Sequence, residues 1–186
     1  MRAARAAAIA AAVLLVVGGC TREPRPEPTP GAVPSHAPSG AVLVCGVDES
    51  SLAAVTGERA GGPVAGPSLD GDACSAAMPE DAPLAGQALL LTVSVLPVDS
   101  PDGATELERI DGTRDRAPDV RYDGVHGAAW LDDAAREHRF SAVSGSSVVW
   151  GDHVVKVTIG SGAAGRDIAA DLLALSSQVA RSVGLD

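Results

Sequence analysis

Aromatic residues and lysine are scarce in this chain of 186 residues. Its aromatic side chains are Phe140, Tyr122, Trp130 and Trp150, and its single lysine is Lys156. Platforms on which nucleic-acid bases or sugar rings could stack are therefore poorly supplied. Because so few large rings are available, the core has to be built mainly from Ala, Val, Leu and Ile.

Motifs for catalysis and metal binding are lacking too. The serines at 141, 144, 146 and 147 lie neither in a Gly-x-Ser-x-Gly elbow nor beside a Ser-x-x-Lys partner. His126, His138 and His153 lie on separate segments without the close spacing of metal ligands. The acids of residues 99–123 and 132–133 do not follow a calcium-loop pattern. We therefore expect a non-catalytic protein without a metal or cofactor.

One glycine-rich segment matches a nucleotide-binding pattern but lacks the second parallel strand that such a site requires. Residues 160–165 read Gly-x-Gly-x-x-Gly, between an expected strand and an expected helix. Only 21 residues follow Gly165, so no second parallel strand can complete the βαβ unit that a dinucleotide requires. We interpret the segment as a flexible connection.

The chain is strongly acidic, with a formal net charge of −10. Its first twenty residues hold two arginines and no acid, so the remainder carries an even larger negative charge. Nucleic acids and anionic lipid headgroups both require cationic contacts. Their binding is therefore not expected.

The N-terminus has the parts of a bacterial export signal. Arg2 and Arg5 precede the apolar run of residues 6–17, which is too short for the about 20 residues of a membrane-spanning helix. The following Val-Gly-Gly-Cys segment, 17–20, resembles the lipobox of bacterial lipoproteins. That resemblance implies cleavage before Cys20, diacylation of its sulfur, and anchoring at the extracytoplasmic face of the cell membrane, with no need for a spanning helix.

The next segment is rich in proline and predicts a tether. Six prolines lie between residues 21 and 40, and proline at this density favours extended polyproline II over helix or sheet. We therefore divide the chain into a signal peptide (1–19), a lipidated cysteine with a tether (20–40), and a folded domain (41–186).

Two further cysteines, Cys45 and Cys74, allow a single intramolecular pairing. A disulfide is the favoured interpretation, since disulfides persist outside the cytoplasm. Two free thiols, or half of a metal site, are the alternatives.

Hydrophobic patterns in the domain predict a mixed α+β fold. Helices are expected at 48–57 and 168–183, with a possible short one at 105–110 inside a long polar stretch, 99–123. Strands are expected at 87–98, 125–131, 139–143, 147–150 and 153–159, with turns at 144–146 and 151–152. Together these elements predict one twisted antiparallel sheet covered by a short N-terminal and a long C-terminal helix.

The order of these features resembles a family of actinobacterial lipoproteins of unknown function. The resemblance rests on the lipobox, the Pro-rich tether, the Cys45-x-x-Asp48-x-x-x-Leu52-x-x-x-x-Gly57 opening, the second cysteine, the 124–130 segment and the closing amphipathic helix. The expected fold is also similar to extracytoplasmic sensor domains of some actinobacterial receptor kinases. This likeness implies an exported binding or sensing module and supplies no catalytic residue.

Two functions follow as hypotheses. The first is a lipid-anchored, non-catalytic module that binds an envelope protein or another envelope component. The second is a carrier of a small molecule or lipid, with a cavity between the sheet and the helices.

Overall fold

The computed structural model describes residues 31–78, 89–112, 118–131, 143–160 and 162–185. The expected signal peptide, Cys20 and the first part of the expected tether lie outside these ranges. So do His138, the acids 132–133 and most of the strand expected at 139–143. None of the helices in the described ranges has the length and apolar character needed to cross a membrane.

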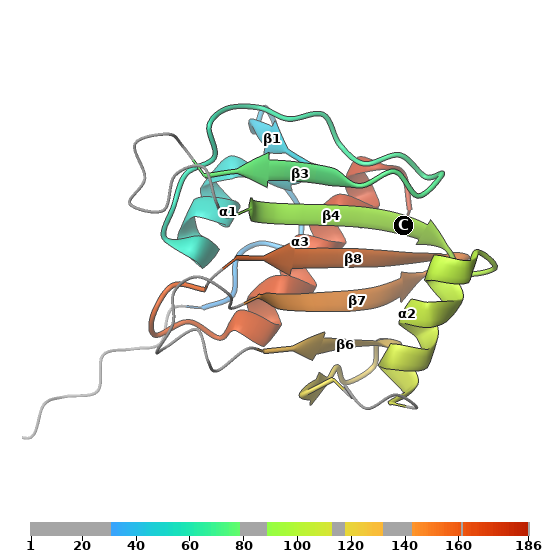
Figure 1. Ribbon diagram of the computed structural model, residues 1–186. Helices are drawn as coiled ribbons and strands as arrows, with labels where there is room; N and C mark the ends of the chain where they lie inside the picture. The colour runs from blue at the N-terminus through green and yellow to red at the C-terminus, as the bar shows by residue number, and fades with distance from the viewer. Residues whose placement is uncertain (1–30, 79–88, 113–117, 132–142, 161, 186) are drawn as a thin grey trace, which may run out of the picture.

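The fold is α+β, as predicted, and is organised by one six-stranded antiparallel sheet with the order β3-β4-β8-β7-β6-β5 (Figure 1). Its strands are β3 (Cys74–Ala77), β4 (Leu89–Pro97), β8 (His153–Ile159), β7 (Ser144–Trp150), β6 (Gly127–Trp130) and β5 (Val120–Arg121). The chain also forms a small hairpin of β1 (Leu43–Val44) and β2 (Val47–Asp48). The described residues also form three helices: α1 (Glu49–Thr56), α2 (Pro101–Asp111) and α3 (Ile168–Ser182).

The main core lies between the sheet and α3, which runs behind it in Figure 1. Alternation along β8 turns Val155, Val157 and Ile159 toward α3, where Leu172 and Leu175 meet them, all fully buried. Burying a Leu or Val side chain contributes about 1.5–3 kcal/mol. The aliphatic core expected from the shortage of aromatics is therefore present.

The opposite face of the sheet is covered at one end by α2, which lies in front of the strands in Figure 1. Ile110 packs there against Leu96 and Val154, in a second and smaller cluster. Ser100 caps the helix by accepting a hydrogen bond from the Gly103 amide. The helix expected at 105–110 is thus a longer element, and it covers only part of this face.

A disulfide joins the β1–β2 hairpin to β3 through Cys45 and Cys74, whose Cα atoms are 5.5 Å apart. The hairpin turn consists of Cys45 and Gly46, with φ of +52° and +83°. Two consecutive residues with positive φ form the turn that fits the twist of a two-residue hairpin, which explains the glycine at the second position. The predicted pairing is therefore confirmed, and free thiols or a half metal site are excluded for these two cysteines.

The turn predicted at 144–146 is wrong, because those residues belong to β7. The pairing of Ser144 with Ile159 and of Ser146 with Val157 continues the ladder to the end of β8. Small residues are needed here for packing: the hydroxyl of Ser146 lies 2.9 Å from that of Ser176 on α3. The turn at 151–152 is confirmed, with Gly151 at φ +59°.

Residues 31–34, which we call the strap, are bound to α3 although the sequence places them in the tether. The Val33 amide donates to Asp171 at 3.1 Å, and the carbonyls of Gly31 and Pro34 accept from Arg166 at 3.0 Å and Gln178 at 2.7 Å. Asp171 and Gln178 are seven residues apart and so share one side of the helix. The strap therefore lies on the α3 side of the sheet.

The two α3 residues that bind the strap, Asp171 and Gln178, also bind other parts of the chain. Arg166 forms an ion pair with the fully buried Asp171. The hydrogen bond between the two side chains raises the pKa of Arg166, although burial alone would lower that pKa. Gln178 accepts from the Asp48 amide at 2.8 Å and donates to Ser51 at 3.1 Å. The strap, the start of α1 and α3 consequently form one hydrogen-bonded unit.

Candidate binding face

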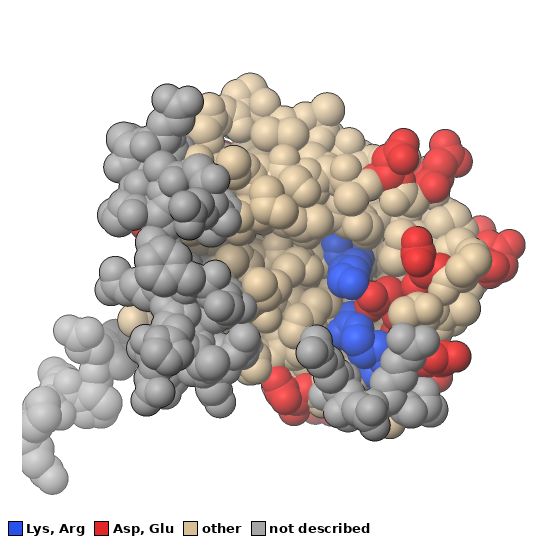
Figure 2. Space-filling model, viewed as in Figure 1, with Lys and Arg blue, Asp and Glu red and all other residues tan. Residues whose placement is uncertain are grey.

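One part of the sheet surface is polar and is not covered by α2. It consists of Ser75, Thr92, Ser94, Lys156 and Thr158, which we call the open face. Ladder register places Ser75, Thr92 and Thr158 side by side across three strands, and Ser94 beside Lys156. Figure 2 shows this side of the molecule, with an uncharged area over β3, β4 and β8 and cations beside the acidic surface of α2.

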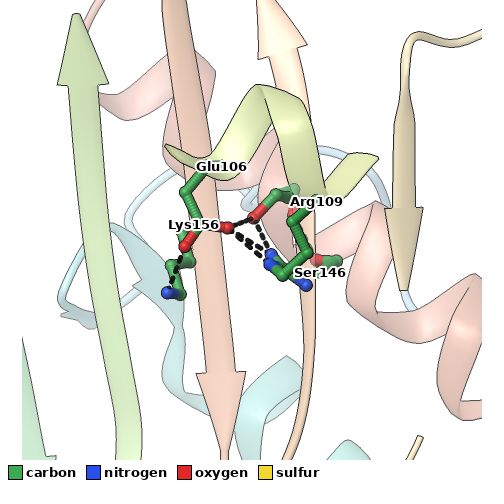
Figure 3. Close-up of polar contacts among 6 residues, drawn as sticks. Glu106, Arg109, Ser146 and Lys156 are labelled. Atoms are coloured by element: carbon green, nitrogen blue, oxygen red, sulfur yellow. Dashed lines mark hydrogen bonds and ion pairs between the residues drawn. The ribbon is translucent and has the colours of Figure 1, made fainter. Parts of the chain in front are cut away.

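Where the open face meets α2, two cations converge on one carboxylate. Lys156 donates to Glu106 Oε1 at 2.5 Å, and Arg109 donates to Glu106 Oε2 through Nε at 2.8 Å (Figure 3). The hydroxyl of Ser147 on β7 donates to the same Oε2 at 2.9 Å. We call Glu106, Arg109, Ser147 and Lys156 the Glu106 cluster.

The charges of the Glu106 cluster are unequally exposed. The Glu106 side chain is 7% exposed, while Lys156 is 34% exposed. Burial alone would raise the pKa of Glu106, but hydrogen bonds from Lys156 and Arg109, and their charges, outweigh it and hold the pKa below its usual range. The cluster thus keeps an ionised carboxylate buried and leaves part of the lysine side chain exposed. The formal charges of Glu106, Arg109 and Lys156 sum to +1, in a chain whose net charge is −10.

Trp130 holds the guanidinium of Arg109 in place. The Arg109 guanidinium carbon lies 3.5 Å from the centroid of the indole ring, and Lys156 Nζ lies 5.8 Å from it. The ring also packs against Gly145, directly across the ladder, where a Cβ atom would collide with the indole. Because Arg109 and Gly145 both contact the ring, we interpret Trp130 as a support for the cations and not as a stacking platform.

The structure separates the residues considered from sequence. Nε2 of His126 lies 3.3 Å from Oδ1 of Asp111, and Nδ1 of His153 lies 2.7 Å from Oδ1 of Asp152. Each of these two histidines therefore has its own carboxylate partner. No group of three or more potential metal ligands occurs among the residues that the structure describes. Ser146 of β7 hydrogen-bonds to Ser176 on α3, Ser147 of β7 hydrogen-bonds to Glu106, and Trp150 packs on the main core.

Sequence reasoning missed the Glu106 cluster, although weak signals for it were present. Glu106 and Arg109 are three residues apart, the spacing of neighbours on one side of a helix. Alternation in β8 places Lys156 on the face opposite Val155 and Val157. What could not be predicted was that α2 would pack over β7 and β8 and bring these side chains together.

Comparison with known proteins adds no assignment: no protein-family model, curated protein or solved structure matches this chain.

Proposed function

We propose that this protein is a lipid-anchored, non-catalytic binding module of the bacterial cell envelope, and that its open face carries the binding site. The observation that carries the proposal is an asymmetry of the sheet. The face toward α3 is buried, and the strap lies on its side of the sheet, whereas the part of the other face that α2 leaves uncovered has partly exposed hydroxyls and a lysine.

The strap supports this orientation of the domain. With Cys20 as the lipid attachment point, only residues 21–30 separate the membrane anchor from the strap. At about 3.1 Å per residue in polyproline II, this segment reaches on the order of 30 Å. The anchor then joins the domain on the α3 side, and the open face is directed away from that attachment.

The lipobox-like segment and the order of tether, cysteines and closing helix support the proposed anchor. We also propose that the chain belongs with the actinobacterial lipoproteins that it resembles. The carrier hypothesis is less favoured, since buried side chains, among them Leu172, Leu175 and Val157, fill the layer between α3 and the sheet.

Side-specific photo-crosslinking in intact cells tests the proposal. A photoreactive amino acid is placed at Ser94 on the open face or, as the control, at exposed Arg181 near the end of α3. We expect envelope adducts from Ser94 and few from Arg181, and we expect Cys20→Ala to release the protein from the membrane fraction. Equal adducts from both positions, or membrane retention of Cys20→Ala, would contradict the proposal.

A further inference from the structure

We infer that the open face binds an acidic saccharide, meaning a sugar chain that carries carboxylate, sulfate or phosphate groups. Its anionic group would be held by Lys156, and its hydroxyls by the side chains of Thr92, Ser94 and Thr158. This inference rests on the proposed function and specifies the ligand class of the same face.

Charge indicates an anionic ligand at the edge of α2. Lys156 has three donor hydrogens, and its one contact to a carboxylate in the described structure is with Glu106. Glu106 is directed inward, and its oxygens already accept hydrogen bonds from Lys156, Arg109 and Ser147. Because the Lys156 side chain is partly exposed and the Glu106 side chain is buried, an anion that approaches from solvent reaches the lysine more readily than the carboxylate.

The rest of the open face indicates a hydroxylated ligand more than a protein. Protein interfaces depend on large apolar or aromatic anchors in their centre. The open face offers Ser75, Thr92, Ser94 and Thr158 instead, and the nearby Trp130 ring is already in contact with Arg109 and Gly145. Hydroxyl groups donate and accept hydrogen bonds, which suits the hydroxyls of a sugar.

The negative charge of the whole chain makes this inference easier to test. A protein of net charge −10 repels polyanions in general, so binding of one has to be local. Replacing Lys156 by glutamine and replacing Arg181 by glutamine change the net charge equally. Arg181 is exposed on α3, on the other side of the sheet, and is therefore a matched control.

Titration of the unlipidated chain from Thr21 onward with polygalacturonate, a carboxylated polysaccharide, tests the inference. We expect saturable binding that is about tenfold weaker in Lys156→Gln, because a charge-assisted hydrogen bond is lost, and unchanged in Arg181→Gln. Thr158→Val, which removes a hydroxyl and nearly preserves shape, should weaken binding severalfold. Neutral dextran should not bind.

Three results of the titration would overturn the inference. They are no binding of polygalacturonate, equal losses in Lys156→Gln and Arg181→Gln, and binding of poly-glutamate as tight as that of polygalacturonate. The last result would identify an acidic peptide as the ligand. Adducts from Ser94 that contain only protein would likewise refute the saccharide while leaving the binding face intact, so the two proposals fail separately.

Discussion

Replacing Glu106 by glutamine should destabilise the domain markedly, because two cations share this one carboxylate. The substitution keeps the size of the side chain and removes its charge. Breaking a buried ion pair costs about 3–5 kcal/mol, whereas exposed pairs contribute about 0–1 kcal/mol. Glu106 is 7% exposed but Lys156 is 34% exposed and can recover water contacts. We therefore expect a loss of about 2–3 kcal/mol, between the values for an exposed and a fully buried pair.

Thermal unfolding of the chain from Thr21 onward measures this loss. For a domain of this size the change corresponds to a decrease in Tm of about 6–9 °C. Asp72→Asn is the control, since it neutralises an exposed carboxylate before β3. Adding Lys156→Met to Glu106→Gln should cost less than the two single losses together, because the residues interact directly. A decrease in Tm no larger than that of Asp72→Asn would refute the assignment of a buried, coupled carboxylate.

The same carboxylate predicts a direction for acid unfolding. The pKa of Glu106 is lowered by folding from an ordinary value of 4.5, so its stabilisation is fully present above that value. The contribution is lost as the pH falls from about 5 toward the lower folded pKa. We expect Glu106→Gln to have a shallower decrease in stability than the wild type over this range, as measured by denaturant titration at several pH values. Parallel curves would contradict the expectation.

The remaining predictions concern the disulfide, the strap and β7. Reducing the Cys45–Cys74 disulfide, whose cysteines are 29 residues apart, should lower the unfolding free energy by about 3–4 kcal/mol; equal Tm with and without reductant would contradict this. Asp171→Asn should lower the unfolding free energy by about 2–4 kcal/mol and speed hydrogen exchange in the strap, because Arg166 loses its buried partner. Unchanged exchange would contradict the conclusion that this ion pair helps to hold the strap. Gly145→Ala should cost about 1–3 kcal/mol and shift tryptophan fluorescence, since its methyl group would collide with an indole ring; unchanged fluorescence and stability would refute that contact.

Local patterns predicted the strongest elements of this fold well. The alternation of residues 153–159 gave the bounds of β8, and the spacing of Leu172, Leu175 and Val179 predicted α3. Asp48 and Gly57, the first and last residues of the helix expected at 48–57, are the caps of α1, and the Ser51 amide donates to Asp48. These features succeed because strand and helix periods, and the chemistry of helix ends, are decided by neighbours in sequence.

The features that were missed depend on contacts between distant segments. Residues 144–146 have the composition of a turn, yet they extend β7, where Gly145 leaves room for Trp130 and Ser146 bonds to Ser176 on α3. The sequence around Asp171 does not indicate that this residue binds Arg166 and the strap. Proline density likewise could not reveal that residues 31–34, which were expected in the tether, bind to α3. The Glu106 cluster was missed for the same reason.

Cosedimentation with isolated cell-envelope fragments tests most directly the claim that the open face is the binding face. The unlipidated chain from Thr21 onward is mixed with the fragments as wild type, Lys156→Gln or Arg181→Gln, and the bound fraction is measured after sedimentation. We predict that the wild type and Arg181→Gln bind alike and that Lys156→Gln is largely released. Equal binding of all three proteins, or no binding of the wild type, would contradict the claim.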